Sequence, residues 1–334
     1  MKKLTLAIVG LGVVGKGLVE SILLKRKVLR RELGLDIVVT AICEREGCVE
    51  DENGIDLPKV LNLAKKGKLI HHPNFSPTPT LEVLDKAPAD VMIELTPGKL
   101  PDANPGREHI LKALSKGMHV VTSNKAPLAT DYHNLVQVAE KNERKLLFEA
   151  AVGGAIPVIR TGKAIKEYDT ITSIHGILNG TTNFILDKMG EEGIDLKMAL
   201  KEAQELGIAE PDPRYDIEGI DSAAKLVILA NALMDMKVEY GDVKVEGISE
   251  ITPEAISLAR EHNYVIKLIA DVSELRVGPR LVPSSHPLNI KGTLNAIMLK
   301  TELAGELSFI GKGAGPKETS SALLSDIIEI GLWS

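Results

Sequence analysis

The sequence has few aromatic residues and no excess of positive charge. Four Phe, five Tyr and one Trp among 334 residues are too few for a platform on which nucleic-acid bases stack. The 40 Lys and Arg against 46 Asp and Glu leave a net charge of −6, which argues against a basic surface for nucleic acid. No apolar run approaches the roughly 18 residues that a membrane helix needs. Neither nucleic acid nor a membrane is therefore an expected partner.

Cysteine is almost absent. Cys43 and Cys48 are too few for a disulfide framework, which fits a reducing compartment. The apolar run after Lys2 and Lys3 resembles a signal peptide, but Gly10 and the glycines after it interrupt the run and no cleavage site follows. We therefore expect a cytoplasmic protein.

Strand and helix patterns alternate over the first part of the chain, and the length suggests two domains. Strands that alternate with helices predict βαβ units and a parallel sheet over residues 1–150. Clustered strands and helices over residues 151–315 predict an α+β domain with a mixed sheet. The amphipathic C-terminal helix, within residues 316–334, is expected to complete the first domain. The fold class is therefore α/β with a second, α+β domain.

A glycine-rich motif follows the first expected strand and opens a helix. The G-x-G-x-x-G motif consists of Gly10, Gly12 and Gly15 with Val13 and Val14 between the last two. In this context the glycines allow a tight turn, a close approach to pyrophosphate and close helix–strand packing. The helix N-terminus adds amide groups and a positive dipole end. The motif predicts a Rossmann-type domain that binds NAD or NADP.

The end of the second expected strand offers two opposite signals for cofactor choice. Glu44 can accept hydrogen bonds from the ribose hydroxyls of NAD, whereas Arg45 can hold the 2′-phosphate of NADP. We lean slightly towards NADP, with use of both cofactors open. Thr96, Ser123 and Lys125 follow two further strands, so we expect them at the nicotinamide half, because ligands bind at the carboxyl ends of parallel strands.

The segment 206–225 combines carboxylates with a lysine. Asp221 and Lys225 are four residues apart and lie on one face of an expected, largely apolar helix. A surface ion pair is the simple interpretation, and a divalent metal held by carboxylates is another. A buried lysine beside carboxylates is instead a candidate acid or base. With a nicotinamide cofactor, such a lysine serves the oxygen of a carbonyl or alcohol, and the carboxylates favour a substrate with an ammonium group.

These motifs resemble the homoserine dehydrogenase family, in its short form without an aspartokinase or regulatory ACT domain. The strongest similarity is G-x-x-E-P-D-P followed by D-x-x-G-x-D-x-x-x-K, over residues 206–225. Further similar segments, in the family's order, are 123–125, 149–157, 179–183, 245–251, 286–292 and 311–315. The resemblance implies reversible, NAD(P)-dependent interconversion of L-homoserine and L-aspartate 4-semialdehyde, in threonine, methionine and isoleucine biosynthesis.

The resemblance also implies roles for individual residues. Lys225 matches the family's proton donor, and Lys125 matches the second active-site lysine, which contacts cofactor and substrate. The residues that match substrate-binding positions are Glu210, Asp221, Asp216, Gly180 and Thr181. The residues that match cofactor contacts are Val13, Val14, Thr96, Ser123, Gly207 and Gly315.

Two further properties come only from the resemblance. Family members bind Na⁺ through backbone carbonyls at positions that match Glu149, Val152, Gly154 and Ile156, although this stretch is equally interpretable as a hinge. The family's second domain builds a homodimer. Ile208 departs from the family, which usually has an aromatic residue there, so one substrate contact is lost or replaced.

Three other enzyme or protein classes compete with this assignment. Aspartate-semialdehyde dehydrogenase needs a nucleophilic cysteine in its catalytic domain, but Cys43 and Cys48 are expected beside the adenosine end of the cofactor instead. An amino-acid dehydrogenase that acts on a C–N bond stays open. So does a noncatalytic NADP sensor, although a sensor has no need of a proton donor.

Overall fold

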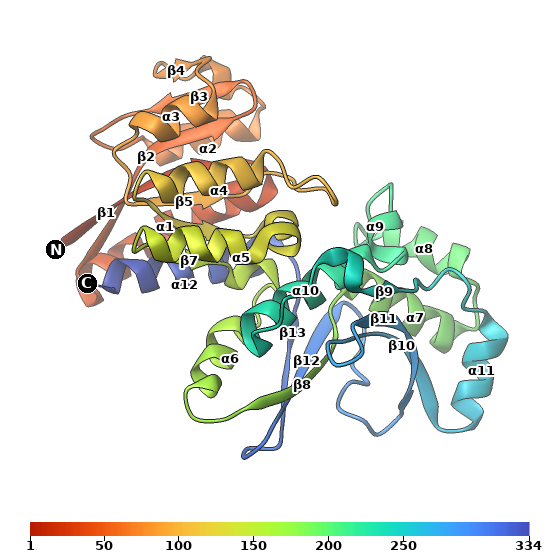
Figure 1. Ribbon diagram of the computed structural model, residues 1–334. Helices are drawn as coiled ribbons and strands as arrows, with labels where there is room; N and C mark the ends of the chain where they lie inside the picture. Colours follow the sequence, from red (N-terminus) through yellow and green to blue (C-terminus); the bar gives the residue numbers. More distant parts are fainter. Residues whose placement is uncertain (334) are drawn as a thin grey trace. The chain divides into compact units, whose positions relative to one another are not determined.

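The computed structural model describes residues 1–333, which form two units (Figure 1). One unit comprises Met1–Ala151 with Gly315–Ser334, and the other comprises Val152–Ala314. The first unit thus takes in residues from both ends of the chain. None of the helices in residues 1–333 combines the length and apolar character needed to cross a bilayer.

The first unit is built on a twisted sheet with the strand order β4-β3-β2-β1-β5-β6-β7. Five of its strands, β2, β1, β5, β6 and β7, pair in parallel, whereas β3 pairs antiparallel with β2 and with β4. The strands are β1 (Lys2–Val9), β2 (Leu35–Glu44), β3 (Gly47–Glu50), β4 (Phe75–Ser76), β5 (Val91–Glu94), β6 (His119–Thr122) and β7 (Leu146–Leu147). Because parallel neighbours are joined through helices, the carboxyl ends of β1, β2, β5 and β6 meet at one edge.

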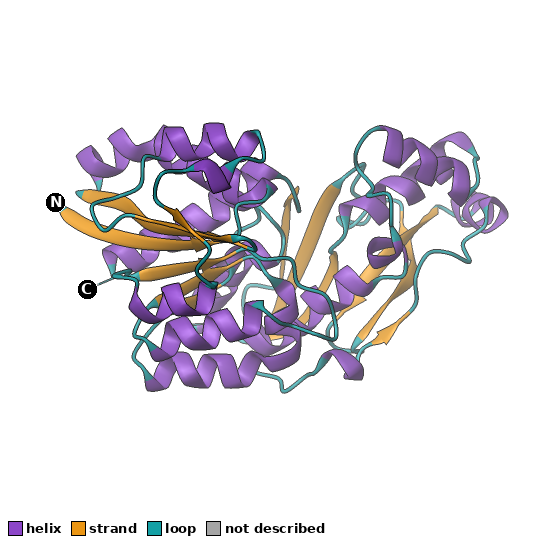
Figure 2. Cartoon of the chain, turned by 90° about the horizontal axis from the view of Figure 1, so that it is seen from above, coloured by secondary structure: helices purple, strands orange, loops and turns teal. Residues whose placement is uncertain are grey.

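Helices lie on both faces of this sheet (Figure 2). They are α1 (Val13–Glu32), α2 (Leu57–Lys65), α3 (Thr80–Lys86), α4 (Gly106–Ser115), α5 (Lys125–Lys141) and α12 (Pro316–Leu332), with short turns η1 (Leu69–His71) and η2 (Glu149–Ala151). Helix α12, blue in Figure 1, packs against α1. A Cβ on Gly17 would lie 2.7 Å from Ser320 Oγ and 2.9 Å from the Pro316 carbonyl oxygen, so a side chain there would push the two helices apart.

Two features of the first unit were not expected from the sequence. The helix α2 begins after Asp56, whose side chain accepts a hydrogen bond from the Lys59 amide. The hairpin of β2 and β3 places Cys43 directly opposite Cys48, and the two form a disulfide. Two cysteines make no disulfide framework, but this single disulfide was not expected; it forms because the short turn between β2 and β3 folds one strand back onto the other.

The second unit contains a mixed sheet with the strand order β13-β12-β8-β10-β11-β9. Its pairs are antiparallel, except that β9 runs parallel to β11. The strands are β8 (Ile171–Ile177), β9 (Lys244–Val245), β10 (Tyr264–Asp271), β11 (Arg276–Pro283), β12 (Leu294–Thr301) and β13 (Glu306–Lys312). The mixed sheet predicted from the sequence is confirmed.

Helix α10 (Ile220–Met234) of the second unit is almost fully buried and packs against strands β8, β10 and β11. The other helices are α6 (Val158–Lys166), α7 (Gly180–Glu192), α8 (Leu196–Glu205), α9 (Arg214–Ile217) and α11 (Pro253–Glu261), with the turn η3 (Tyr240–Asp242). Thirteen consecutive residues of α10, Asp221–Leu233, are buried, which explains its nearly continuous run of Ala, Leu, Ile and Val. Any charged side chain that points from this helix is therefore held in a protected environment.

Candidate functional site

The glycine motif forms a turn at the carboxyl end of β1 in the first unit. Gly10 has a positive φ of 98°, and a Cβ there would lie 2.9 Å from the Leu95 carbonyl carbon and oxygen. A Cβ on Gly15 would lie 2.3 Å from the Gly10 oxygen, whereas one on Gly12 would meet nothing within 4 Å. Gly10 and Gly15 thus serve the tight turn and the packing, and Gly12 leaves open space at the N-terminus of α1.

The start of α1 suits a pyrophosphate group. Gly12 is the N-cap residue, no side chain caps the helix, and its first turn contains no acidic residue. The amides of the first turn, including those of Val13 and Val14, are therefore available to an anion at the positive end of the helix dipole. Gly315, the N-cap of α12, also has a positive φ, of 133°. These observations fit the dinucleotide that the motif predicts.

Glu44 reaches back to the glycine motif. Its Oε1 accepts a hydrogen bond of 2.5 Å from the Leu11 amide. Burial raises the pKa of Glu44, and the Leu11 amide partly opposes that shift by favouring the ionised form. Arg45, the next residue, is exposed. The two residues that we expect to choose the cofactor thus differ: the carboxylate is held in place, and the guanidinium extends from the surface.

Thr96, Ser123 and Lys125 lie at the carboxyl edge of the same sheet. Thr96 follows β5, and Ser123 follows β6. Asn124 caps α5 by accepting a hydrogen bond of 3.2 Å from the Ala126 amide, and Lys125 is the first residue of this helix. The short connection from β6 to the capped helix α5 therefore fixes the position of the Lys125 backbone.

Lys225 and Asp221 form a buried pair on α10 in the second unit. Only 7% of each residue is exposed. The Lys225 Nζ donates hydrogen bonds of 2.6 Å to Asp221 Oδ2 and 2.6 Å to the Leu178 carbonyl oxygen. The sequence left a surface ion pair open as an interpretation; the burial rules it out.

Asn179 connects this pair to Asp216. Its Nδ2 donates to Asp216 Oδ1 at 2.7 Å and to Asp221 Oδ2 at 3.0 Å. Its Oδ1 accepts a hydrogen bond of 2.9 Å from the Thr182 amide, which caps α7. Burial raises the pKa of Asp216, and the neighbouring Asp221 carboxylate adds to that shift. Two carboxylates and an ammonium group thus share one site, which we call the Lys225 cluster: Asn179, Asp216, Asp221 and Lys225.

The sequence did not select Asn179 as a site residue. It lies within the 179–183 segment that carries the resemblance, and Asn before a helix is a common N-cap. That signal predicts the cap but not the amide bridge, because the bridge depends on where Asp216 and Asp221 arrive from later parts of the chain.

The remaining substrate-site candidates surround the cluster less tightly. The Thr181 Oγ1 donates to the Ile208 carbonyl oxygen at 3.3 Å, which holds the segment with Gly207 and Glu210 near the start of α7. Glu210 itself is exposed. A Cβ on Gly180 would lie 2.5 Å from the Thr293 oxygen, so this position requires glycine. The structure therefore brings Asp216 and Asp221 to Lys225 but leaves Glu210 on the exposed loop.

The sodium candidates lie in one continuous stretch of the chain, residues 149–156. Glu149 belongs to η2, and its amide donates to Asp326 Oδ2 at 3.0 Å. Gly153 and Gly154 have positive φ values of 78° and 57°. Glycine is therefore favoured at both positions, because side-chain-bearing residues rarely adopt this backbone conformation. Among residues 1–333, no group of three or more His, Cys, Asp or Glu side chains could hold a metal ion, which removes the support for a divalent metal held by carboxylates.

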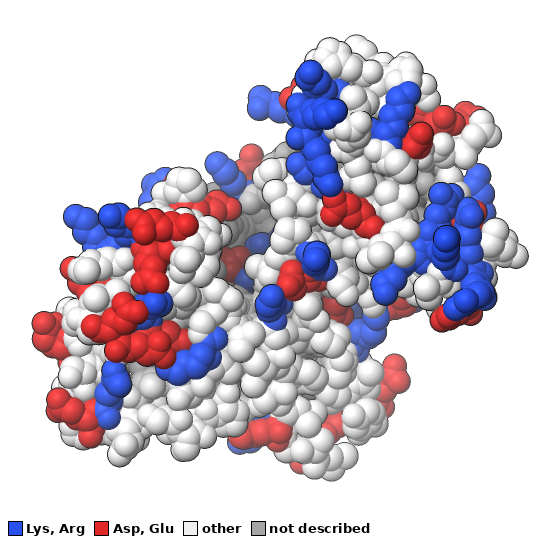
Figure 3. Space-filling view, turned by 180° about the vertical axis from the view of Figure 1, so that it is seen from behind, with Lys and Arg blue, Asp and Glu red and all other residues white. Residues whose placement is uncertain are grey.

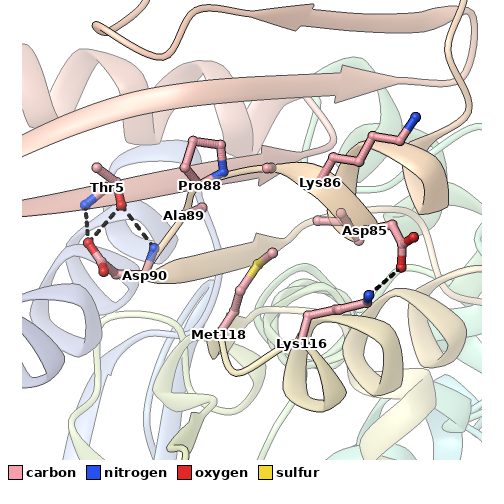
Figure 4. Close-up of a pocket in the computed structure, with 10 residues that line it drawn as sticks. Thr5, Asp85, Lys86, Pro88, Ala89, Asp90, Lys116 and Met118 are labelled. Atoms are coloured by element: carbon pink, nitrogen blue, oxygen red, sulfur yellow. Dashed lines mark hydrogen bonds and ion pairs between the residues drawn. The ribbon is translucent and has the colours of Figure 1, made fainter.

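A pocket of about 350 Å³ opens at the amino end of β5 (Figure 4). Thr5, Asp90 and Lys116 are among the residues that line it, and Lys116 pairs with Asp85 at 2.8 Å. In open α/β sheets ligands bind at the opposite, carboxyl edge. This pocket is therefore not part of the candidate site.

Two family models match the chain. The model described as the NAD binding domain of homoserine dehydrogenase matches residues 10–149, and the model described as homoserine dehydrogenase matches residues 157–328. The chain is 47% identical to the homoserine dehydrogenase of Methanocaldococcus jannaschii, over 97% of each chain. It is 38% identical to the NAD(+)-dependent homoserine dehydrogenase of Pseudomonas canavaninivorans, over 99% of this chain and 97% of the relative.

Solved structures agree with these sequence matches. A structure assigned to homoserine dehydrogenase from Archaeoglobus fulgidus has a TM-score of 0.91 and 44% identity, over 98% of this chain and 99% of that one. A hyperthermophilic archaeal homoserine dehydrogenase mutant in complex with NADPH has a TM-score of 0.86 and 30% identity, over 98% and 97% of the two chains. The fold class expected from the sequence is confirmed.

Proposed function

The chain belongs to the homoserine dehydrogenase family, and we propose how its residues carry out the NAD(P)-dependent interconversion of L-homoserine and L-aspartate 4-semialdehyde. In this proposal residues 1–150 with 316–334 bind the cofactor, and residues 151–315 bind the substrate. The observation that carries the proposal is the buried Lys225 cluster, which combines a proton donor with carboxylates. The two alternatives that stayed open, C–N bond oxidation and a noncatalytic sensor, have no such support from the family matches.

Lys225 moves the proton. An ammonium group has three N–H donors, and within residues 1–333 two of them are used, by Asp221 and by the Leu178 carbonyl oxygen. The third can donate to the aldehyde oxygen during reduction and take the proton back during oxidation. The nicotinamide ring, when bound, supplies or accepts the hydride. Lys125 is the second catalytic lysine, at the cofactor edge.

The carboxylates hold the substrate ammonium. Asp221, Asp216 and Glu210 provide negative charge, and Gly180 and Thr181 form the adjoining turn at the start of α7. Asp221 already pairs with Lys225, so it both orients the proton donor and shares its charge with the substrate. Glu210 lies on an exposed loop and reaches the substrate from outside the buried cluster.

The cofactor-binding residues are Gly10, Gly12, Val13, Val14, Gly15, Glu44, Arg45, Thr96, Ser123, Lys125, Gly207 and Gly315. An NAD(+)-dependent relative and a relative bound to NADPH support the use of both cofactors. We lean slightly towards NADP, because the exposed Arg45 can approach a 2′-phosphate. Arg45→Ala should lower kcat/KM for NADP about tenfold or more and leave NAD nearly unchanged, since a charge-assisted contact contributes about 1.5–3 kcal/mol. An equal effect on both cofactors in A340 assays would contradict this role.

The sodium ion is held by the carbonyl oxygens of Glu149, Val152, Gly154 and Ile156. The two positive φ values within this stretch support the proposal. Thermal unfolding in NaCl and in choline chloride at equal ionic strength tests it. A midpoint that rises with Na⁺ alone supports a site, and identical curves contradict one.

A homodimer formed through the second unit and a cytoplasmic location complete the proposal. The support for both is the family and its biosynthetic activity. Both signs of charge are interspersed over the face drawn in Figure 3. Light scattering during gel filtration tests the dimer: a mass near twice the 36.0 kDa of the chain is expected, and a single-chain mass would contradict it.

The activity is tested directly by absorbance at 340 nm. Purified protein with L-homoserine and NADP⁺ or NAD⁺ should show a rise in absorbance, and the better cofactor settles the preference. No rise, and no oxidation of either reduced cofactor with L-aspartate 4-semialdehyde, would contradict the activity.

A further inference from the structure

A buried carboxylate lies directly behind the nicotinamide half of the proposed cofactor site. Glu94, the last residue of β5, is 0% exposed. Its Oε1 accepts a hydrogen bond of 2.8 Å from the Thr96 amide, and it also accepts one from the Thr96 hydroxyl. Its Oε2 lies 2.9 Å from Nδ1 of His109, a buried residue of α4. One side chain thus holds both polar groups of Thr96.

The same carboxylate reaches the turn that carries Lys125. Asn124 Nδ2 lies 3.5 Å from Glu94 Oε1, and Asn124 Oδ1 caps the helix that begins at Lys125. The Asn124 amide donates to Thr122 Oγ1 at 2.9 Å, and that hydroxyl donates to the Glu94 carbonyl oxygen at 3.0 Å. The ends of β5 and β6 are therefore joined through the side chain and the backbone of Glu94.

Two glycines pack against Asn124, next to the buried Glu94 carboxylate. A Cβ on Gly98 would lie 2.0 Å from Asn124 Oδ1, and a Cβ on Gly106 would lie 2.5 Å from Asn124 Nδ2. The backbone at Gly98 and at Gly106 therefore packs directly on Asn124. In such a dry environment a carboxylate persists only if donors satisfy its oxygens, and Thr96, Asn124 and His109 supply them.

We propose that Glu94 and His109 are positioning residues, which hold Thr96 and the Lys125 turn in the arrangement that receives the nicotinamide ring. Because a carboxylate only accepts hydrogen bonds, the Thr96 hydroxyl must direct its single proton towards Glu94. Thr96 Oγ1 would then meet a bound cofactor only as an acceptor, so it would suit the amino end of the nicotinamide carboxamide rather than its oxygen. His109 keeps Glu94 turned towards Thr96. This inference rests on the proposed assignment of Thr96 and Lys125 to the cofactor site.

Glu94→Gln tests directly whether Glu94 sets the direction in which the Thr96 hydroxyl donates its proton. The variant keeps the size of the side chain but replaces one accepting oxygen with a donating NH₂ group. The matched control is Asp90→Asn, at the residue that precedes β5. Asp90 Oδ2 accepts hydrogen bonds of 2.7 Å from both the amide and the hydroxyl of Thr5, the same kind of pairing at the amino edge (Figure 4).

The decisive readout separates the two halves of the cofactor. We would measure dissociation constants for ADP-ribose, which lacks the nicotinamide, and for NADH and NADPH by calorimetry. Glu94→Gln should weaken the reduced cofactors about tenfold or more and leave ADP-ribose within about twofold of wild type. Asp90→Asn should leave all three constants unchanged. These binding measurements do not depend on turnover, so they are distinguishable from a failure of the proposed activity.

Two results would overturn the proposal. Equal weakening of ADP-ribose and the reduced cofactors would assign Glu94 a purely structural role, and unchanged binding of both would remove any role. If Glu94→Gln does not fold, Thr96→Val replaces it, since it removes the hydroxyl from the edge of the cluster. The same split between ADP-ribose and reduced cofactor is expected there, and its absence would equally contradict the proposal.

Discussion

Two buried lysines in the second unit differ in the number of hydrogen-bond acceptors around their ammonium groups. Lys267 on β10 is 1% exposed, and its Nζ donates to Asn183 Oδ1 at 2.8 Å, Asp187 Oδ1 at 2.7 Å and the Ile290 carbonyl oxygen at 2.7 Å. Lys225 on α10 is 7% exposed and donates to two acceptors within residues 1–333. Lys267 has thus used its three donors, whereas Lys225 retains one.

The difference separates a structural lysine from a chemical one. Lys267 joins β10, α7 and the segment before β12, because Asp187 Oδ2 also accepts from the Gly292 amide at 2.7 Å. Burial lowers the pKa of Lys267, and the Asp187 carboxylate opposes that shift. Burial alone therefore does not identify a catalytic lysine; an N–H group left for a substrate does.

The largest expected effect is a loss of kcat when Lys225 is replaced, which would separate Lys225 from Lys267. Lys225→Met should lower kcat for homoserine oxidation by about 10²–10⁴-fold, the range that general acid–base groups contribute. Its effect on stability should be smaller than that of the matching change at Lys267. The Leu178 carbonyl oxygen keeps a hydrogen bond from Asn295, and Asp221 keeps one from Asn179. Initial rates at 340 nm and thermal unfolding measure the two quantities.

The matching change at Lys267 should act on stability. Lys267→Met removes the nearer ammonium partner of Asp187 and leaves only Lys291, at 3.8 Å; breaking a buried ion pair costs about 3–5 kcal/mol of the free energy of unfolding. The folded variant should retain its kcat, because Lys267 contacts no residue of the Lys225 cluster directly. Urea unfolding measures the loss. A variant as stable as wild type would contradict the structural role.

The smallest effect is the pH dependence of stability that Asp216 of the Lys225 cluster should cause. The pKa of Asp216 is raised in the folded state, so its ionisation destabilises the fold. The stability that protonated Asp216 contributes is fully present below the pKa of Asp216 in the unfolded chain. It is lost as pH rises through the higher pKa of Asp216 in the folded protein. Asp216→Asn should therefore gain stability relative to wild type over that acidic range and then level off. A difference in unfolding free energy that is flat with pH would contradict it.

The sequence predicted the fold class because period and spacing are local signals. Alternating strands and helices, the G-x-G-x-x-G motif and an apolar helix with Asp221 and Lys225 on one face all appear without knowledge of the tertiary fold. The reported matches confirm the fold and the family. The individual site residues remain proposals, although the structure brings Asp216 and Asp221 to Lys225.

Features that depend on contacts between distant segments were missed. Lys267 lies in an apolar strand, Tyr264–Asp271, but its acceptors come from α7 and from Ile290. Glu94 resembles any residue at the end of a strand until His109 and Asn124 fold onto it. The disulfide needed recognition of the Glu44–Gly47 turn, where Gly47 has a φ of 147°.

The central claim is that Lys225, and not buried lysine in general, carries the proton. It is tested most directly by kcat for L-homoserine oxidation in Lys225→Met and Lys267→Met, at a temperature where circular dichroism shows both variants folded. The account predicts a loss of about 10²-fold or more for Lys225→Met and a kcat near wild type for Lys267→Met. Equal losses in both variants, or a kcat near wild type in Lys225→Met, would contradict it.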